Sequence, residues 1–335
     1  MTFRARITGT GMYVPERVVT NQDLEQLMDT SDEWIRQRTG IEERHFICEG
    51  QTPVDLAEAA ARRALEAAQL EPDELDCIVL ATLSPQADFP GTSFFLQERL
   101  GLSDTPCFDL RAQCSGFLFS LATAKSFVAS GQFQRVLVVG CEVHSTGIDL
   151  TNAGRDVAVL FGDGAGAVVV ERSDEPEDPR GILEVRLHAQ GKYAEKLWLE
   201  APGSGFWPVR INEQILRERR HFPRMDGKFV FKHAVTRMPE VLREALEVAG
   251  TKLEDVDLFL FHQANLRINE FVAGQLGIPP EKTYNNIQKY GNCSAASIPM
   301  LLAECERAGR LERGDLVSLT GFGSGFTWGS AVVRW

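Results

Sequence analysis

The sequence predicts an α/β protein built from two duplicated βαβαβ halves. Residues 76–82 (DCIVLAT) form a near-continuous apolar run, which is typical of a strand buried on both faces of a parallel sheet. An alanine-rich segment at residues 53–69 precedes this run and is predicted to be a helix. The same helix–strand unit occurs twice, because the segment that begins at Ala64 aligns without gaps on the segment that begins at Ala245. Two such halves imply two parallel-type sheets with helices on their faces.

The first half is expected to cover residues 1–175. Thr52 is a predicted N-cap, with Pro53 at the first helical position and the Asp55 carboxylate three residues after the cap. In chain order, the predicted elements are a strand over 7–12, helices over 22–28, from 30 and over 53–69, strands over 76–82 and 107–110, a helix over 117–130 and a strand over 135–140. The glycines at 162–167 are interpreted as a tight turn before a strand over 168–170.

The second half is expected to cover residues 176–335, and the boundary stretch at 173–180 is rich in Asp, Glu and Pro. Its units repeat the order of the first half, with a strand over 258–261, a short run at 283–285, a turn at Asn292, a helix that ends near 308–309 and a strand over 315–320. Ligands of open α/β sheets bind beyond the carboxyl ends of the strands. Functional residues are therefore expected at strand ends where the two halves meet.

Composition excludes several classes of protein. The chain has 335 residues, a net charge of −12 and 44% apolar residues, and broad nucleic-acid binding needs a basic surface instead. No apolar run approaches the roughly 18 residues that span a bilayer, and the N-terminus lacks a signal peptide's apolar core. The seven cysteines are scattered without a CxxC pair, which fits reduced thiols and neither a disulfide framework nor a metal site. We expect a cytoplasmic protein with no nucleic-acid or membrane partner.

Cys114 is the predicted nucleophile. It follows a polar turn after the strand at 107–110 and comes just before the helix at 117–130. Unpaired backbone N–H groups and the helix dipole favour an anion at this position, so the thiol is expected to ionise more readily than a free cysteine. The alternative is that Cys114 is a small buried hydrophobic residue.

Two residues of the second half are candidates to face Cys114. His262 follows the strand at 258–261, and Asn292 occupies the turn that corresponds to the Cys114 turn. A cysteine that carries an acyl group and two neutral donors that hold an oxyanion would form an acyl-enzyme site, and the flexible turn at 321–326 offers a further backbone N–H. The alternatives are a structural histidine and an asparagine that tolerates an unusual backbone angle.

These residues lie in motifs that resemble the β-ketoacyl-acyl carrier protein synthase III family of the thiolase superfamily. The similarity covers nearly the whole chain in order and spacing. Its motifs are DTSDEWI and RTG within 29–40, CSGF at 114–117, FGDGAGA at 161–167, HQANLR at 262–267, GNCSAAS at 291–297 and GFTWGS at 325–330. The resemblance implies the five-layered αβαβα thiolase-like fold, usually as a homodimer.

The resemblance also implies a two-step Claisen condensation without a cofactor or a metal. An acyl group passes from acyl-CoA, which is a substrate, to Cys114. Malonyl-acyl carrier protein then loses CO2, and its enolate attacks the acyl thioester. By analogy, His262 and Asn292 assist decarboxylation, while the backbone N–H groups of Cys114 and Ser324 form the oxyanion hole. The family often has glycine at the position of Ser324, but a backbone donor survives this change.

Binding residues are carried over from the same motifs. The resemblance implies that Trp34 and Arg155 sandwich the adenine and that Arg38 contacts phosphates. The implied CoA and substrate set is Thr30, Trp34, Arg38, Arg155, Gly227, Phe231 and Asn265, of which the last three line the pantetheine channel. Phe89 matches the residue that closes the partner subunit's acyl pocket, which suggests a short acyl starter. The alternatives are a core aromatic for Trp34 and solvated charges for the arginines.

Carrier-protein docking and one long segment depart from the family pattern. Lys232, Arg237 and Arg267 are the candidate docking residues, but Gly274 and Gln275 stand where the family often has a lysine pair. The segment 197–224 is longer than that of the family's bacterial fatty-acid enzyme by about ten residues, a size that can hold a functional element. Its basic residues at 217–224 are interpreted as a solvated face, with an anion-docking site as the alternative.

These departures leave a second function open, a related acyltransferase of secondary metabolism that passes the acyl group to a different acceptor. A non-catalytic partner subunit is a third hypothesis. Such subunits typically lose the nucleophile, whereas Cys114, His262 and Asn292 are all present here.

Overall fold

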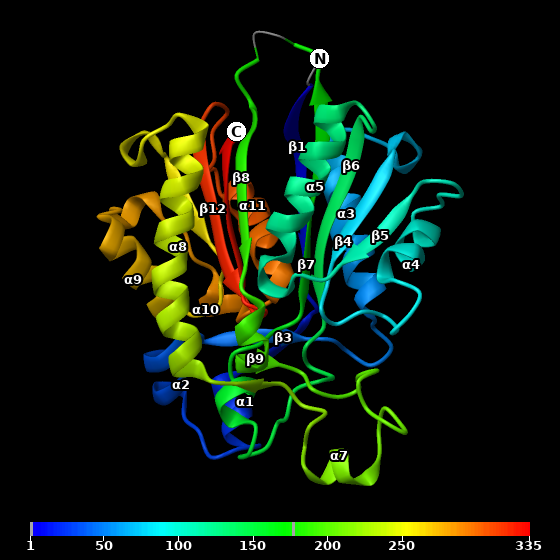
Figure 1. Cartoon of the computed structure of the whole chain (residues 1–335), viewed down its shortest axis with the longest axis vertical. Coiled ribbons are helices and arrows are strands. Elements are labelled where there is room, and N and C mark those ends of the chain that lie inside the picture. Colours follow the sequence, from blue (N-terminus) through cyan, green and yellow to red (C-terminus); the bar gives the residue numbers. More distant parts are fainter. Residues whose placement is uncertain (1–2, 176–177) are drawn as a thin grey trace.

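Two mixed sheets with the same strand topology form the framework of the protein (Figure 1). In the computed structural model, the described residues are 3–175 and 178–335. The first sheet has the order β1 (Arg4–Tyr13), β7 (Gly164–Ser173), β6 (Arg135–Glu142), β4 (Cys77–Ala81) and β5 (Cys107–Leu110). The second has the matching order β8 (Gly181–Ala189), β13 (Thr327–Arg334), β12 (Leu316–Gly323) and β11 (Leu258–Phe261). The predicted duplication is confirmed by this shared topology.

The expectation of parallel-type sheets is only half right. The β4–β6 and β11–β12 pairs are parallel, but β7 and β13 run antiparallel to both of their neighbours. In the second sheet, the counterpart of β5 at 283–285 forms only a single bridge, between Phe259 and Thr283. The prediction of a tight turn at 162–167 is also partly wrong, because Gly164 and Gly166 lie inside β7. A Cβ at Gly166 would come within 2.5 Å of the Met300 backbone nitrogen, so a glycine lets the helix α11 (Ser297–Arg307) pack closely on this strand.

Helices cover both sheets in five layers, which confirms the predicted fold class. The helices α5 (Gly116–Ser130) and α11 (Ser297–Arg307) lie between the sheets, and each contacts strands of both (Figure 1). The outer face of the first sheet is covered by α3 (Pro53–Ala68) and α4 (Thr92–Arg99), and that of the second by α8 (Gly227–Ala249) and α9 (Leu266–Leu276).

The central core explains why α5 is apolar almost all round. Leu121 and Val128 of α5 and Leu301 of α11 are fully buried in one hydrophobic cluster with Val138 of the first sheet and Leu319 of the second. A helix that faces a sheet on each side has no wide solvent face to make polar. The predicted cap of α3 is confirmed, since Thr52 and Asp55 form a reciprocal capping box with Pro53 in the first turn.

Smaller elements gather at one end of the layers. The strands β2 (Arg17–Thr20) and β3 (Glu43–Phe46) pair with each other, as do β9 (Leu197–Trp198) and β10 (Arg224–Met225). The short helices are α1 (Asn21–Glu25), α2 (Asp32–Thr39), α6 (Arg155–Ala158), α7 (Glu213–Arg217) and α10 (Ile287–Tyr290). The helix predicted over 22–28 corresponds to α1, which ends at Glu25 and is therefore shorter than predicted. The predicted domain boundary between 175 and 176 adjoins residues 176–177, which lie outside the described residues.

Candidate active site

A cavity of about 620 Å³ lies where the two halves meet. Cys114 reaches it from the start of α5, His262 from the end of β11, and Asn292 from the loop before α11. The three residues are far apart in the sequence, but the two equivalent sheets present these ends to one another. The remaining lining includes Trp34, Arg38, Gly227, Lys228, Phe231, Asn265, Arg267 and Phe322.

Cys114 lies in a 3-10 turn, η2 (Gln113–Ser115), directly before α5. The end of β12 packs directly against Cys114. A Cβ added at Gly323 would come within 2.8 Å of the Cys114 Cβ, so only glycine fits there. Thr327 links the two segments, since its hydroxyl donates to the carbonyl oxygens of Ala112 (3.2 Å) and Ser324 (3.0 Å). The Ser324 backbone N–H acts on the Cys114 sulfur and lowers the pKa of the thiol.

The expected easy ionisation of Cys114 is wrong. Burial raises the pKa of the thiol to about 11, and this effect outweighs a hydrogen bond with the Ser294 hydroxyl that lowers it. The Glu142 carboxylate raises this pKa further, whereas the backbone N–H groups of Ser324 and Cys114 lower it. The helix N-terminus does not compensate for the loss of water around a thiolate.

His262 is almost completely buried, and its ring is held in one orientation. Its Nδ1 lies 2.5 Å from the Ser297 hydroxyl oxygen, and the same hydroxyl accepts the backbone N–H of Gln263 at 3.3 Å. The Ser297 hydroxyl can donate to Nδ1, and in that tautomer the His262 proton lies on Nε2, which can donate to a ligand. Nε2 has no hydrogen-bond partner within residues 3–175 and 178–335. Burial lowers the pKa of His262 to about 3, so the ring is a neutral donor at physiological pH.

Asn292 is oriented by its own turn. Its side-chain oxygen accepts the backbone N–H of Ser294 at 2.8 Å, so the amide nitrogen remains the group that can donate to a ligand. The backbone of Asn292 is held by Leu160 and Gly162, through hydrogen bonds of 2.8 and 3.2 Å. Two neutral donors, Asn292 and His262, thus line the same cavity as a buried thiol.

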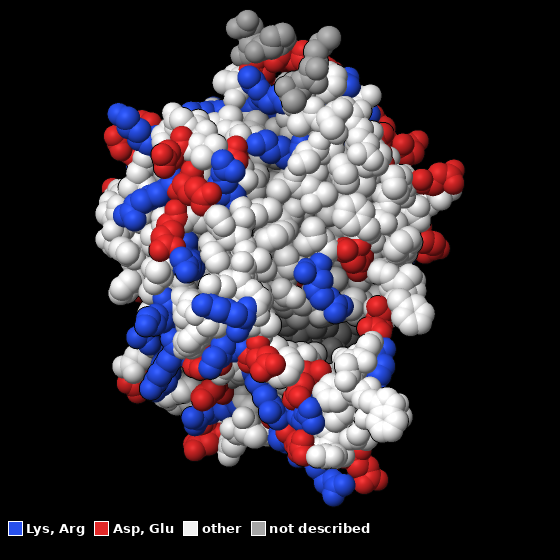
Figure 2. Space-filling model, in the orientation of Figure 1, with Lys and Arg blue, Asp and Glu red and all other residues white. Residues whose placement is uncertain are grey.

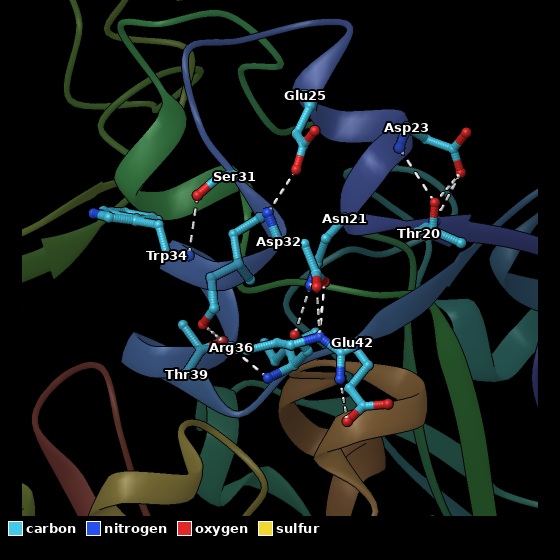
Figure 3. A network of polar contacts seen from close by, with 12 residues as sticks. Thr20, Asn21, Asp23, Glu25, Ser31, Asp32, Trp34, Arg36, Thr39 and Glu42 are labelled. Atoms are coloured by element: carbon cyan, nitrogen blue, oxygen red, sulfur yellow. Dashed lines mark hydrogen bonds and ion pairs between the residues drawn. The ribbon is translucent and has the colours of Figure 1, made fainter.

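A polar network fixes the helix α2 at the cavity mouth (Figure 3). The Ser31 hydroxyl accepts a hydrogen bond of 3.1 Å from the Trp34 backbone N–H. The Glu25 carboxylate accepts one of 2.6 Å from the Asp32 backbone N–H. Asn21 donates to the Asp32 carboxylate at 2.8 Å. The network caps the helix N-terminus and sets the direction in which Trp34 projects.

The comparisons with known proteins agree with this geometry. Residues 108–191 match the family described as 3-oxoacyl-[acyl-carrier-protein (ACP)] synthase III, and residues 246–335 match its C-terminal domain. A β-ketoacyl-[acyl-carrier-protein] synthase III of Alkalilimnicola ehrlichii is 46% identical, with 99% of each chain covered. The chain belongs to this synthase III family. It is accordingly a condensing enzyme of the acyltransferase class.

Solved structures of synthase III proteins extend the similarity. The crystal structure of the synthase III of Aquifex aeolicus is 47% identical, covers 99% of this chain and 100% of that one, and has a TM-score of 0.90. The priming β-ketosynthase of the R1128 polyketide biosynthetic pathway is 36% identical, with 99% and 97% coverage and a TM-score of 0.89. The length of the chain is therefore typical of the synthase III family.

The predicted adenine slot of a synthase III is closed here. The Arg155 guanidinium lies 4.9 Å from the centre of the Trp34 ring and donates to the Asp29 carbonyl oxygen at 2.8 Å. Arg38 also lies over this ring, at 4.7 Å. Trp34 and Arg38 line the cavity, but Arg155 and Thr30 are not among its lining residues. The Thr30 hydroxyl is buried instead, without a hydrogen bond in the described part of the chain.

The predicted pantetheine residues do line the cavity. Gly227 and Phe231 reach it from the first turns of α8, and Asn265 from the start of α9. Asn265 also has a structural role, because its amide donates to the Arg38 carbonyl oxygen at 2.9 Å and its oxygen caps α9 through the Arg267 N–H. This residue therefore joins α9 to the end of α2.

Phe89 does not line the cavity of its own chain. Its side chain is 82% exposed on the loop between β4 and α4. Asp88 next to it forms an ion pair of 2.7 Å with Arg210 of the segment 197–224, which carries the 90% exposed Trp207. Any role of Phe89 in an acyl pocket must therefore be exerted on another copy of the chain.

The three candidate docking residues differ in their surroundings. Arg267 lines the cavity, and Lys232 is exposed on α8, one helical turn after Lys228, which lines the cavity too. Arg237 is instead paired with Glu240 at 2.7 Å and lies over the ring of Trp328. Figure 2 shows Lys and Arg side chains gathered over the lower part of α8 and beside α2. Lys232 and Arg267 are thus available to a partner, whereas Arg237 is occupied.

Four of the five arginines of the segment 197–224 form ion pairs, whereas Arg224 donates to the Glu218 carbonyl oxygen. Arg219 pairs with Asp149, and Arg220 with Glu200, while Arg217 lies 3.6 Å from Glu213. The Arg219–Asp149 pair holds the loop, which carries α7, against the body of the protein, whereas the other two pairs lie within the loop. The ion pairs support the interpretation of the basic residues at 217–224 as a solvated, charged surface. The alternative, an anion-docking site, is less favoured because Arg217, Arg219 and Arg220 are already paired.

Three buried residues near the site were missed by the sequence analysis. Ser297 orients His262, Ser294 contacts the Cys114 sulfur, and Glu142 accepts hydrogen bonds from the Ser84 hydroxyl at 2.5 Å and the Ala295 N–H at 3.4 Å. Burial raises the pKa of Glu142 to about 7. The sequence signal for Glu142 was a carboxylate directly after the apolar run 136–141. No group of three or more His, Cys, Asp or Glu side chains suited to a metal occurs within the described ranges.

Proposed function

We propose that this enzyme condenses a short acyl group from acyl-CoA with malonyl-acyl carrier protein and so initiates fatty-acid or related acyl-chain synthesis. The observation that carries the proposal is the convergence of Cys114, His262 and Asn292 on one cavity at the junction of the two halves. Family membership supplies the reaction class, and this geometry supports the residue roles.

In the first step, the Cys114 sulfur attacks the carbonyl carbon of acyl-CoA. A new carbon–sulfur bond forms, the bond to the CoA sulfur breaks, and the thiol proton of Cys114 leaves with CoA. Negative charge develops on the carbonyl oxygen, where the backbone N–H groups of Cys114 and Ser324 stabilise it as an oxyanion hole. Because the thiol is buried, substrate binding near these donors precedes ionisation.

In the second step, malonyl-acyl carrier protein enters the same cavity and loses CO2. The electrons of the broken carbon–carbon bond form an enolate, whose oxygen accepts hydrogen bonds from His262 Nε2 and the Asn292 amide nitrogen. The enolate carbon then attacks the acyl thioester, and Cys114 leaves as the thiolate. Neutral donors suit this step because the site needs no proton transfer to hold the enolate.

The cavity lining supports a path for the pantetheine arm past α8 and α9. Trp34 and Arg38 mark its mouth, where we place the adenine and phosphates of CoA. Lys232 and Arg267 lie beside this mouth and would meet the acidic carrier protein, an arrangement that favours encounter between opposite charges.

We infer that the enzyme acts as a homodimer. The strand β5 forms one edge of the first sheet, and the neighbouring helix α4 exposes Phe94 and Phe95. Figure 2 shows a broad face over α4 and α5 with few charges. A second copy that covers this face would pair the sheet edge and bury the aromatic rings. The dimer would also bring Phe89 to the partner's acyl pocket.

The seven cysteines are all free, which supports a reducing, cytoplasmic location. No helix in the described residues is long and apolar enough to cross a membrane. The alternative acyltransferase of secondary metabolism is less well supported, because eight curated relatives at 43–46% identity are named β-ketoacyl-acyl carrier protein synthase III.

Intact-mass spectrometry tests the proposed function. The wild type and Cys114→Ala are incubated with a panel of acyl-CoAs and then with malonyl-acyl carrier protein. We expect a mass gain with one range of acyl sizes, absent in the variant, that malonyl-acyl carrier protein discharges as a β-ketoacyl product. A gain that this substrate fails to discharge would favour a different acceptor. No gain with any acyl-CoA would contradict the proposal.

A further inference from the structure

The Cys114 sulfur has one side-chain hydrogen-bond partner in the described part of the chain, the hydroxyl of Ser294 at 3.8 Å. His262 and Asn292 line the same cavity, but neither is hydrogen-bonded to the sulfur. Among the largest influences on the pKa of the thiol, the one charged group is Glu142, which disfavours the thiolate. The buried sulfur therefore depends on Ser294 and two backbone N–H groups.

The backbone around Ser294 holds its hydroxyl in place. Ser294 has a φ of 42°, in the left-handed region that non-glycine residues rarely adopt. The conformation is maintained on both sides, because its N–H donates to Asn292 and the next N–H, that of Ala295, donates to Glu142. A residue kept in a sparsely populated backbone region at an active site is often fixed there for function.

The duplication supports the same conclusion. The turn η2 begins at Gln113 and leads into α5, and the equivalent turn η6 (Ser294–Ala296) leads into α11. Ser294 is thus the counterpart of Gln113, which has a φ of 47°. Each half contributes one such turn, and the second turn delivers a hydroxyl to the nucleophile that the first turn carries.

We propose that Ser294 is a further catalytic residue, whose hydroxyl donates a hydrogen bond to the Cys114 sulfur when negative charge develops on it. In the resting thiol, the S–H donates to the hydroxyl oxygen; after ionisation, the hydroxyl rotates and donates to the thiolate. The serine is not deprotonated, and the proton that leaves Cys114 still departs with CoA. The inference rests on the proposed function of Cys114 and adds a group that the catalytic set of Cys, His and Asn does not contain.

The hydroxyl acts wherever the sulfur is anionic. This is the case when Cys114 attacks acyl-CoA and again when the acyl group leaves it for the enolate. Decarboxylation of the malonyl group places charge on an oxygen near Asn292 and His262 instead. Removal of the hydroxyl should therefore slow both acyl transfers and spare decarboxylation.

The test is the pH dependence of Cys114 alkylation by iodoacetamide, quantified by peptide mass in the full-length protein. In Ser294→Ala, the midpoint of the profile should rise by about one pH unit and the rate at pH 7.5 should fall roughly tenfold, because a hydrogen bond to a charged group is lost. Acylation by acyl-CoA should fall by a similar factor, with malonyl decarboxylation unchanged. Ser120→Ala is the matched control, since Ser120 is buried in α5 and its hydroxyl has no partner among the described residues.

Ser294→Gly is the second variant, since glycine adopts the positive φ without strain. A raised midpoint in both variants supports the proposal, whereas a wild-type profile in either folded variant overturns it. Alkylation needs no acyl substrate, so the result is separate from the proposed function. A protein that no acyl-CoA modifies, but whose alkylation depends on Ser294, would overturn the condensation proposal alone.

Discussion

The Arg155 guanidinium lies 4.9 Å from the centre of the Trp34 ring, so no aromatic base fits between these two residues. A base stacked on both sides needs about 7 Å between its neighbours, twice the usual contact distance of about 3.5 Å. Arg155 and Arg38 both lie over the indole ring, and a base that stacks on Trp34 must displace one of them. Binding of the nucleotide is therefore expected to move an arginine side chain, while the network around α2 keeps Trp34 in place.

Trp34→Ala should weaken the use of acyl-CoA. Loss of one aromatic stacking surface is expected to raise KM roughly tenfold with little change in kcat, because stacking on a base contributes about 1–3 kcal/mol. Steady-state kinetics with the acyl-CoA that the mass panel identifies gives the comparison. The matched control is the same acyl group on pantetheine, which lacks the adenine. An equal loss with both donors would show that Trp34 supports the fold of the site instead.

Asn292→Ala should separate the two chemical steps. The amide donor is proposed to act on the enolate, so decarboxylative condensation should fall about 100-fold to 1,000-fold, the usual cost of an oxyanion donor. Acylation of Cys114, followed by intact mass, should change far less. Asn292→Asp is the companion variant, because it keeps the oxygen that the Ser294 N–H requires and removes the donor. Equal losses in both steps would contradict the assignment.

Phe89 is predicted to set the chain length accepted by the partner's site. Phe89→Thr should widen the range of acyl groups that load Cys114, because a smaller side chain leaves space in the pocket. A mixed dimer sharpens the test, with Cys114→Ala in one subunit and Phe89→Thr in either that subunit or the active one. We expect the wider range only when the inactive subunit carries Phe89→Thr. The same result from the active subunit would place Phe89 in its own pocket.

Lys232→Glu should weaken use of the carrier protein and leave acyl-CoA unaffected. The exposed lysine is proposed to meet an acidic surface, so KM for malonyl-acyl carrier protein should rise several-fold at low salt and less at high salt. The acylation rate with acyl-CoA should remain at the wild-type value. Arg243→Glu is the control, since Arg243 is exposed on the same helix further from the cavity. Similar effects of both reversals would indicate a general charge effect and no local docking site.

The convergence of Cys114, His262 and Asn292 could be predicted from the sequence because it follows from topology. Each residue comes directly after a strand or before a helix of a repeated unit, and such ends meet at one junction. The cap at Thr52 was equally accessible, since its partner Asp55 lies only three residues away. Local signals of this kind depend on neighbouring residues or on a repeat that the sequence displays.

The surroundings of the same residues could not be predicted. The Ala295 N–H that donates to Glu142 is 153 residues away in the chain, and Ser294 reaches Cys114 across 180 residues. The acidity of Cys114 depends on a balance between burial and hydrogen bonds that only the packed structure sets. For that reason the helix N-terminus predicted a readily ionised thiol, whereas burial raises its pKa to about 11.

His144 is expected to make the fold sensitive to acid. Its ring is buried against Phe161, with 4.5 Å between the ring centres, and burial lowers its pKa to about 3. The unfolded chain has the ordinary histidine pKa near 6.5 and takes up a proton that the folded state excludes. The stability associated with the neutral ring is therefore present above about pH 6.5 and is lost as the pH falls towards 3. Between pH 7.5 and pH 5, this loss is about 2 kcal/mol of the free energy of unfolding.

His144→Phe tests this dependence, because phenylalanine keeps an aromatic ring against Phe161 and removes the titration. The free energy of unfolding is measured by denaturant titration at pH 7.5 and pH 5 in both proteins. Burial also raises the pKa of Glu142 and Asp163, and these groups increase the free energy of unfolding on acidification. His262, like His144, decreases it. All three groups remain in the variant, so the difference between the two proteins isolates His144. The variant should lose about 2 kcal/mol less than the wild type on acidification. Equal losses would mean that the folded protein admits the proton, and that the His144 ring is not as isolated from water as its burial implies.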